Sequence, residues 1–255
     1  MIELKSSGEL DVMREAGRVV ARALHAVREH AAPGISTGEL DAVARAVIDD
    51  AGAQPLFLGY QPRWAPSPFP GVICASVNDA VVHGIPGPLR LADGDLVSID
   101  CGARLEGWCA DAAITFTTGT PDPRDEVLLA TAEQALTDGI AAAQPGGRVG
   151  DISHAVGIVG RSAGYGIPAP VGGHGVGREM HEAPFVPNDG APGAGPPLRP
   201  GLVLALEPIF LAGGADALRD GADGWTLFTD DESRAAHVEH TVAITAEGPR
   251  VLTLP

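Results

Sequence analysis

Apolar side chains recur at helical spacing over the first part of the chain. Between residues 9 and 32 they fall on one face of a helix, and Pro33-Gly34 ends the pattern. A second amphipathic stretch follows, with Ser36 or Thr37 as its candidate N-cap, and it runs to about residue 51. The pattern therefore predicts two helices ahead of the first strand.

The rest of the chain mixes strands, helices and proline-rich segments. Residues 55–71 carry five prolines among several aromatic side chains, which predicts an irregular but ordered segment, and residues 186–201 can only form a loop. Strands are predicted at about 72–77, 95–101, 108–117, 202–207, 225–229 and 238–245, and helices at about 125–143 and 149–163. No repeat or long linker divides the chain, so residues 1–255 are expected to form a single domain.

The length and hydropathy of the chain indicate a globular protein. A chain of 255 residues with 45% hydrophobic content can bury a sizeable core. Its longest apolar stretch, residues 201–212, is interrupted by Glu207 and Pro208 and is far shorter than the roughly 20 residues of a membrane helix. The amino terminus lacks the basic start and apolar centre of a signal peptide. We therefore expect a cytoplasmic protein with no membrane partner.

The acidic composition and the three cysteines exclude further classes. A formal net charge of -16 disfavours attraction to nucleic acid or to an anionic membrane. Cys74, Cys101 and Cys109 show no CxxC spacing, which argues against a disulfide framework and against a zinc ribbon. These cysteines are expected to be small buried residues.

Two aspartates in apolar strands point to a bound cation. If residues 95–101 and 108–117 pair as a hairpin with its turn centred on residues 104–107, Asp100 lies directly opposite Asp111. Directly opposed side chains have Cβ atoms about 5 Å apart, and like charges there are destabilising. A solvated hairpin is the alternative, but the apolar neighbours disfavour it, and a buried carboxylate should be paired or bound to metal.

Three more candidate ligands stand in apolar or glycine-rich surroundings. His174 lies within GGHGVG, where glycines permit close approach of the backbone to a bound group, although a plain loop histidine is the alternative. Glu207 follows an apolar run and precedes a proline, where an unpaired charge would be very costly. Glu239 could equally be a partly exposed strand residue. Together with the aspartates, these donors fit one or two divalent metals.

Taken in chain order, these residues resemble a known family. The similar segments are SVNDAVVHGIP, GDLVSIDCGARLEGWCADAAITF, GGHGVGREMHEAP, LRPGLVLALEP, DGWTLFTDD and VEHTVAIT. They resemble the type I methionine aminopeptidases, which are metallopeptidases of the pita-bread family, over nearly the whole chain. The resemblance implies an α+β fold in which helices cover a curved, pseudo-symmetric antiparallel sheet. It also implies removal of the amino-terminal methionine from chains whose second residue is small.

The resemblance implies a centre with two divalent metal ions. Asp100 would bind one ion, Asp111 and Glu239 would bridge both, and His174 and Glu207 would complete the second. Carboxylates with an imidazole suit cobalt, manganese, iron or zinc. A water activated by these ions would attack the first peptide bond.

The resemblance also assigns roles around the peptide bond. Glu207 would accept and shuttle the proton, His83 would lie near the first residue and the scissile amide, and His181 would steady the carbonyl oxygen. Taken alone, either histidine would be interpreted as structural. The positions implied to line the methionine pocket are Phe57, Tyr60, Phe69, Cys74, Met180 and Trp225.

The chain departs from the family pattern around this pocket. Phe57 stands where bacterial members have a cysteine, Phe69 where a tyrosine is usual, and Met180 where a phenylalanine is usual. The connection at 61–68 is also longer than usual, and its Trp64 could narrow or reshape the cleft. Altered specificity for the first residue is therefore an alternative to strict methionine preference.

Two other functions remain as alternatives at this stage. An X-Pro peptidase of the same fold usually carries a large amino-terminal domain, whereas only about 75 residues precede the first motif here. A catalytically inactive, peptide-binding member would be expected to lack ligands, and none is missing. The implied partners are the amino termini of peptides and of nascent chains at the ribosome, with no direct nucleic-acid contact, and the implied oligomeric state is a monomer.

Overall fold

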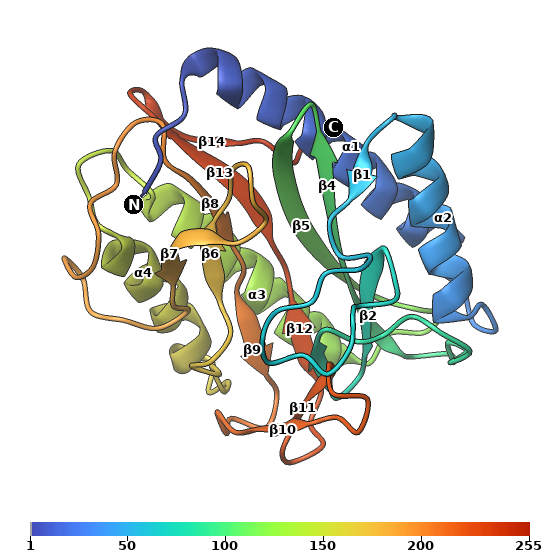
Figure 1. The fold of residues 1–255 in the computed structure, drawn as a ribbon. Helices are drawn as coiled ribbons and strands as arrows, with labels where there is room; N and C mark the ends of the chain where they lie inside the picture. Colours follow the sequence, from blue (N-terminus) through green and yellow to red (C-terminus); the bar gives the residue numbers. More distant parts are fainter. Residues whose placement is uncertain (1) are drawn as a thin grey trace.

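The computed structural model describes residues 2–255 as helices on the outside of several antiparallel sheets (Figure 1). The helices are α1 (Ser7–His30), α2 (Thr37–Asp50), α3 (Pro123–Ala142) and α4 (Val149–Ser162). The strands up to α4 are β1 (Gln54–Pro55), β2 (Ile73–Val77), β3 (Ala80–Val82), β4 (Leu96–Leu105) and β5 (Trp108–Thr117). After α4 come β6 (Gly173–Gly175), β7 (Glu182–Val186), β8 (Val203–Leu206), β9 (Ile209–Leu211), β10 (Leu218–Asp220), β11 (Leu227–Thr229), β12 (Ala235–His237), β13 (His240–Thr245) and β14 (Gly248–Val251).

The predicted helices and longer strands are present, with small differences at their ends. The helix predicted from residue 125 begins at Pro123, because Asp122 caps it and proline suits the first turn. The strand predicted at 225–229 begins only at Leu227, since the Asp223 carboxylate accepts hydrogen bonds from the backbone N–H groups of Trp225 and Thr226. The short strands β1, β3, β6, β7, β9, β10, β12 and β14 were not predicted.

The first two helices begin at matching capping boxes. The Ser6 hydroxyl accepts a hydrogen bond from the Glu9 backbone N–H, and the Glu9 carboxylate accepts one from the Ser6 backbone N–H. Ser36 and Glu39 form the same pair at α2, so Ser36, of the two candidates, is the N-cap. Each box satisfies backbone donors that would otherwise lack partners at a helix start. Within residues 2–255, no helix is long and apolar enough to cross a membrane.

The hairpin formed by β4 and β5 has a tighter turn than the sequence suggested. Leu105 pairs with Trp108, so the loop contains only Glu106 and Gly107, whose φ angles of 50° and 81° are typical of a two-residue hairpin turn. In this register Asp100 pairs with Ala113, and Asp111 pairs with Gly102. The prediction that Asp100 and Asp111 lie directly opposite each other is therefore wrong. They are diagonal neighbours on the same face.

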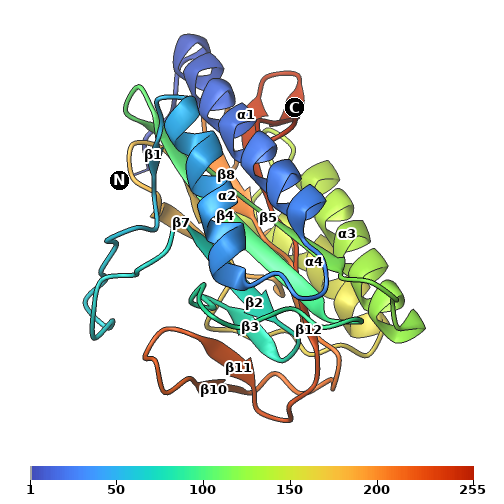
Figure 2. The ribbon, with the colours of Figure 1, turned by 90° about the vertical axis from the view of Figure 1, so that its right-hand side faces the viewer.

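A shift of two residues preserves the face on which each side chain lies, because side chains alternate along a strand. The odd-numbered side chains of β4, from Val97 to Ala103, join a buried core. Figure 2 shows helices α1 and α2 lying across the sheet that contains β4 and β5. The even-numbered positions, including Asp100, face the opposite side. On β5 the even-numbered residues 110, 112 and 116 join the same core, which leaves Asp111 on the side of Asp100.

The other half of the molecule repeats the arrangement of a sheet covered by two helices. Its five-stranded sheet has the order β14-β13-β8-β6-β7, and α3 and α4 pack on it around buried side chains such as Leu128, Ile152 and Leu204. Near Glu207-Pro208 the strand path breaks between β8 and β9. The segment that pairs with β8 and β9 is also divided at this point. Its first strand, β12, pairs with β9, and its second strand, β13, pairs with β8.

Strand β5 joins the two halves where it runs beside β12 and β13 (Figure 1). At the centre of this seam, the Glu239 backbone N–H donates to the carbonyl oxygen of Ala113 at 2.9 Å, and the Ala113 N–H donates in return at 3.4 Å. The seam therefore brings Glu239 next to β5 at the point where the chain passes from β12 to β13.

Two buried threonines extend the seam on either side of this backbone pair. The Thr241 hydroxyl accepts from the Asp111 backbone N–H at 2.9 Å and donates to the Asp111 carbonyl oxygen at 2.7 Å. The Thr115 hydroxyl makes the equivalent two bonds to the backbone of His237, at 3.1 and 2.6 Å. Each half thus supplies a hydroxyl that satisfies backbone groups of the other half.

We expect Thr241→Val to lower the free energy of unfolding by about 1–3 kcal/mol, because it leaves a buried N–H and a buried carbonyl of Asp111 without partners. Valine has nearly the same shape, so packing is retained. Urea unfolding of the metal-free protein measures the effect, with Thr241→Ser as the matched control that keeps the hydroxyl. Equal stability of the two variants would contradict this account of the seam.

Candidate metal centre and peptide cleft

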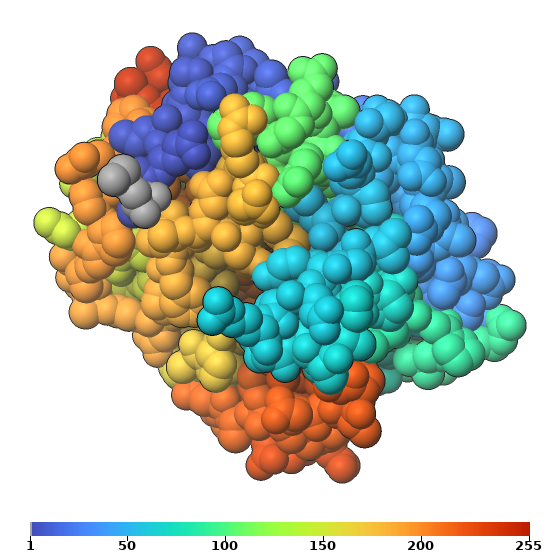
Figure 3. All heavy atoms as spheres, viewed as in Figure 1, coloured from blue at the N-terminus to red at the C-terminus, as the bar shows by residue number. Residues whose placement is uncertain are grey.

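A cavity of about 890 Å³ opens between the two halves. In Figure 3 the cyan surface of the loop that precedes β2 lies across from the gold surface around residue 180, with the orange surface of the β10–β11 region below them. All the predicted site residues line this one cavity: Asp100, Asp111, His174, Glu207, Glu239, His83, His181, Phe57, Tyr60, Phe69, Cys74, Met180 and Trp225. The fold therefore brings the predicted ligands and the predicted pocket residues together.

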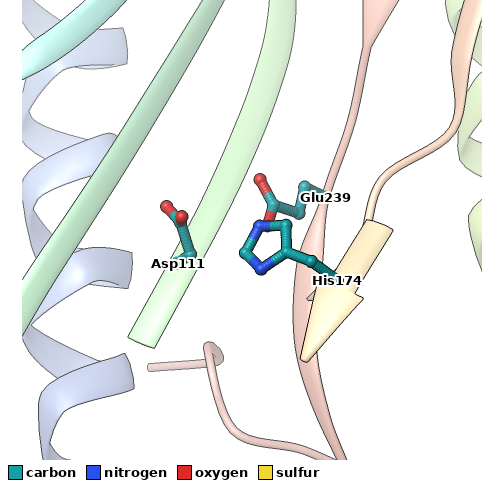
Figure 4. Close-up of side chains that lie close together, drawn as sticks. All are labelled: Asp111, His174 and Glu239. Carbon is teal, nitrogen blue, oxygen red and sulfur yellow. The ribbon is translucent and has the colours of Figure 1, made fainter. Parts of the chain in front are cut away.

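Three candidate ligands converge at the floor of the cavity. Asp111 comes from β5, His174 from β6, and Glu239 from the junction of β12 and β13 (Figure 4). One donor atom of each lies within 4.8 Å of the others, and all three residues are buried. Carboxylate oxygen and imidazole nitrogen at such separations can share one divalent cation.

Asp100 and Glu207 flank this group from opposite halves. Asp100 lies on β4, where it pairs with Cys74 of β2. Glu207 sits at the break between β8 and β9, and its backbone carbonyl accepts a hydrogen bond from Asn188 Nδ2 at 2.9 Å. Its Oε1 lies 3.6 Å from His174 Nε2. The five predicted ligands thus surround a single region of the cavity.

Burial makes ionisation of three of these carboxylates costly in the absence of a cation. Burial raises the pKa of Asp111 to about 6, and burial together with the neighbouring acids raises the pKa values of Asp100 and Glu239 well above their usual range. Burial also opposes ionisation of Glu207, but the adjacent imidazoles of His237, His174 and His181 lower its pKa overall. Glu207 is therefore the carboxylate in this group that favours its ionised form.

The unpaired atoms of the cluster fit a metal centre. Among the described residues, Asp100 Oδ1, Asp111 Oδ1 and Glu239 Oε1 are buried and have no hydrogen-bond partner. Buried carboxylate oxygens without partners are costly unless they are protonated or coordinate a cation. Oxygen donors combined with imidazole suit manganese, iron, cobalt or zinc. The residues present therefore fit the divalent metals that the sequence implied.

His83 and His181 stand on the wall above the cluster as neutral imidazoles. Burial lowers the pKa of His83 to about 4, and desolvation by the surrounding protein lowers that of His181 to about 4 even though its ring is exposed to the cavity. His83 adopts a positive φ of 60°, an uncommon conformation for a residue other than glycine, and such strain is concentrated at functional sites. The Tyr60 hydroxyl lies 3.2 Å from His181 Nδ1.

An aromatic wall forms the other side of the cavity. Phe69 meets both Phe57 and Trp225 edge to face, with ring centroids 6.4 and 5.0 Å apart. Trp225 Nε1 donates to the Ser67 carbonyl at 3.1 Å, which ties the wall to the proline-rich loop. Such edge-to-face contacts build a rigid apolar surface.

Trp64 extends this wall from the loop at residues 61–68. Its ring stacks on His83 with centroids 6.0 Å apart and meets Trp225 at 5.0 Å, while 60% of the residue remains exposed. The sequence prediction that this loop reaches the cleft agrees with the position of Trp64 in the cavity lining. Its effect on specificity remains a prediction.

Sequence reasoning missed a histidine of the cavity, His237. It is 3% exposed, and its Nε2 lies 3.3 Å from Glu207 Oε2 and 3.8 Å from Glu239 Oε2. A signal was available, because His237 stands two positions before Glu239, the spacing that places two strand residues on one face.

Comparison with known proteins gives the class. The chain matches metallopeptidase family M24 over residues 11–246. It is also similar in structure to a prolidase from Pyrococcus furiosus, with a TM-score of 0.78 at 23% identity, over 99% of this chain and 65% of the prolidase. That second likeness concerns the fold alone. The fold and the buried acid and imidazole groups are thus those of a pita-bread metallopeptidase.

Relatives of higher identity narrow the class further. The chain is 51% identical to methionine aminopeptidase 1 of Mycobacterium tuberculosis, over 100% of this chain and 96% of the relative, and 44% identical to methionine aminopeptidase 1 of Bacillus subtilis, over 99% of each. The crystal structure of a methionine aminopeptidase from Thermotoga maritima superposes with a TM-score of 0.95 at 38% identity over 100% of both chains. The chain therefore belongs to metallopeptidase family M24, in its methionine aminopeptidase branch, and the predicted α+β pita-bread fold is confirmed.

Binding of a divalent metal should release protons from the cluster. Because burial raises the pKa of Asp111 to about 6, about half of the metal-free molecules hold a proton there at pH 6 that the ion must displace, and almost none hold it at pH 8. Calorimetric titration with Mn²⁺ in buffers of different ionisation enthalpy measures this release, which should be larger at pH 6. If Asp111→Asn bound the ion with the same release, the assignment of that proton would be wrong.

Proposed function

We propose that this chain removes the amino-terminal methionine from peptides and nascent proteins whose second residue is small. The observation that carries the proposal is the joining, in one cavity, of an apolar aromatic wall and a buried cluster of acids and imidazoles. The wall suits the side chain of the first residue, and the cluster suits hydrolysis of the bond that follows it. We expect residues 1–255 to act as a single catalytic domain.

The side chain of methionine fits the chemistry of the wall. Thioether sulfur makes favourable contacts with aromatic rings, and a flexible unbranched chain adapts to a narrow apolar surface. Phe69, Met180 and Trp225 are all nearly buried, so they hold their positions without a ligand. The first residue and the scissile amide would then lie beside His83.

Metal ions held by the cluster would supply positive charge that ionises a water molecule near neutral pH and polarises the scissile carbonyl. In the proposed arrangement Asp100 would hold one ion, Asp111 and Glu239 would serve both ions, and His174 and Glu207 would hold the second. The supporting observations are the converging donors of Asp111, His174 and Glu239 and the flanking positions of the other two carboxylates.

Glu207 is the group proposed to move the proton. Its carboxylate favours the ionised form among the buried acids, so it can accept a proton from the attacking water. The same carboxyl can then donate that proton to the nitrogen of the leaving peptide, which departs as a neutral amine. A single residue thereby serves first as base and then as acid.

The two wall histidines act as neutral hydrogen-bonding groups. In the tautomer in which His181 Nδ1 accepts from the Tyr60 hydroxyl, Nε2 keeps its hydrogen and can donate to the carbonyl oxygen as negative charge develops. His83 Nδ1 is buried without a partner in the described structure, and its place on the wall suits a contact with the scissile amide. The low pKa values of both rings keep them neutral at pH 7.

We further propose that the protein acts in the cytoplasm, as a monomer, on chains emerging at the ribosome, without direct contact to nucleic acid. The formal net charge of -16 supports the last point, since nucleic acid would be repelled. Fractionation of the host cell and sedimentation of the purified protein test the compartment and the oligomeric state.

Purified protein supplied with Co²⁺, Mn²⁺ or Fe²⁺ should release free methionine from Met-Ala-Ser. His174→Ala should remain folded and lose activity by more than about 100-fold, since loss of a direct ligand exceeds the 10–100-fold typical of a residue behind a ligand. Circular dichroism checks the fold, and chromatography of the products measures release.

The same assay separates the alternatives. No release from Met-Ala-Ser with any of these metals would favour an inactive, peptide-binding member. Comparable rates on Leu-Ala-Ser and Met-Ala-Ser would contradict strict methionine preference. Faster cleavage of a Met-Pro peptide than of Met-Ala-Ser would favour an X-Pro peptidase.

Trp64→Ala should reduce the preference for Met-Ala-Ser over Leu-Ala-Ser. The indole packs on Trp225 and His83, so its removal widens the apolar site, and a lost contact of this kind changes discrimination by roughly tenfold. Ratios of kcat/KM for the two peptides provide the measurement. Trp64→Phe, which keeps an aromatic ring, is the control, and an unchanged ratio in the alanine variant would show that Trp64 takes no part in specificity.

A further inference from the structure

His237 presents a buried, unpartnered nitrogen to the metal cluster. Its side chain is 3% exposed, and its Nε2 makes no hydrogen bond within the described structure. The nearest carboxylate oxygen is Glu207 Oε2 at 3.3 Å, and Glu239 Oε2 follows at 3.8 Å. A ring nitrogen in this environment is costly unless it exchanges a hydrogen bond with one of these oxygens.

The backbone around this ring is held on both sides. The N–H and the carbonyl of His237 both bond to the Thr115 hydroxyl across the seam, and His237 pairs with Ile209 in the ladder between β12 and β9. Ile209 lies two residues beyond Glu207, so the same ladder places the imidazole beside the Glu207 carboxylate. The ring is therefore aimed at Glu207 by fixed main chain.

The two oxygens of Glu207 face two different imidazoles. Oε1 lies 3.6 Å from His174 Nε2, and Oε2 lies 3.3 Å from His237 Nε2. His174 belongs to the group whose donor atoms converge with those of Asp111 and Glu239, whereas His237 is not part of that group. The two histidines thus have different tasks.

We propose that His237 is a positioning residue that donates from Nε2 to Glu207 Oε2 and holds Glu207 Oε1 toward His174, where the second metal ion would bind. The proposal rests on the proposed function insofar as it assumes a metal at this site. Glu207 must both contact a metal and move a proton, so its carboxylate needs one defined orientation. Residues that orient a metal ligand in this way typically change metal affinity by about 10–100-fold when removed.

The separation of 3.3 Å is within hydrogen-bond reach, although the contact lacks the alignment of a complete hydrogen bond in the described structure. Catalytic hydrogen bonds are often long or poorly aligned until the site is loaded. A purely structural histidine would instead direct its nitrogen to a backbone carbonyl or a hydroxyl. His240 does so three residues further on, where its Nδ1 lies 2.9 Å from Thr253 Oγ1.

Titration with Co²⁺ tests the proposal, because its visible absorption reports the geometry of each bound ion. His237→Leu removes the donor at similar volume, and His237→Gln keeps an N–H that can reach Glu207. In the leucine variant we expect the equivalent of Co²⁺ that is held by His174 and Glu207 to bind about 10–100-fold more weakly with an altered spectrum, while the other equivalent is unchanged. The glutamine variant should restore the affinity to within a few fold.

His240→Gln is the matched control, since it changes a neighbouring histidine outside the cavity and should bind both equivalents as the unmodified protein does. Wild-type affinity and spectrum in His237→Leu would overturn the proposal. The proposal would also be overturned if both variants, leucine and glutamine, bound both equivalents of Co²⁺ with equally reduced affinity, since that would indicate a general disturbance of the site.

A measurement on the unmodified protein keeps the proposal testable if the leucine variant does not fold. Long-range ¹⁵N–¹H spectra of histidine-labelled, metal-loaded protein identify which ring nitrogen carries hydrogen, and His237→Gln assigns the signal. Hydrogen on Nε2 supports the proposal, and hydrogen on Nδ1 alone overturns it. Because these readouts need no peptide, they separate the role of His237 from the proposed function, which is tested by cleavage of peptides.

Discussion

The seam between β5 and the β12–β13 segment is the contact on which the rest of the site depends. A backbone pair between Ala113 and Glu239 lies at its centre, and the hydroxyls of Thr115 and Thr241 continue it on either side. Because the hydroxyls satisfy backbone groups of the opposite half, the two sheets meet without leaving buried polar groups unpaired. The same contact places Asp111 and Glu239 side by side, although 128 positions separate them in the chain (239 minus 111).

This arrangement brings carboxylates together in a buried region, where their negative charges must be neutralised by a bound cation or by protons. The seam buries Asp111 and Glu239, and β4 adds Asp100 from the same face of the hairpin. Without a cation, burial raises the pKa values of all three, and repulsion from neighbouring acids, including Glu207, adds to the rise. The ionised cluster has an unfavourable free energy when no cation is bound, and a divalent ion removes this penalty. The cluster therefore binds divalent ions strongly.

The candidate metal ligands and the residues of the aromatic wall lie on different kinds of secondary structure. The candidate ligands stand on strands or at strand ends, where paired backbone fixes their positions. Most of the aromatic wall comes from irregular segments, including the proline-rich loop that carries Trp64 and the turn before β11 that carries Trp225. Strand positions suit a metal site that requires constant geometry, while loops can change specificity without disturbing the ligands.

The sequence by itself determined the features that depend on local periodicity and residue chemistry. Alternation along β4 and β5 was sufficient to place Asp100 and Asp111 on one face, because a shift of two residues in register leaves each face unchanged. Apolar or glycine-rich surroundings also indicated His174, Glu207 and Glu239 as candidate ligands, and all three line the same cavity. The tertiary structure alone decided the pairing of Asp100 with Ala113, since the turn at Glu106-Gly107 requires positive φ at a glutamate that no local pattern indicates. It alone also brought His237 to Glu207, because that contact arises where the chain passes between two sheets, a long-range event that periodicity along one strand cannot encode.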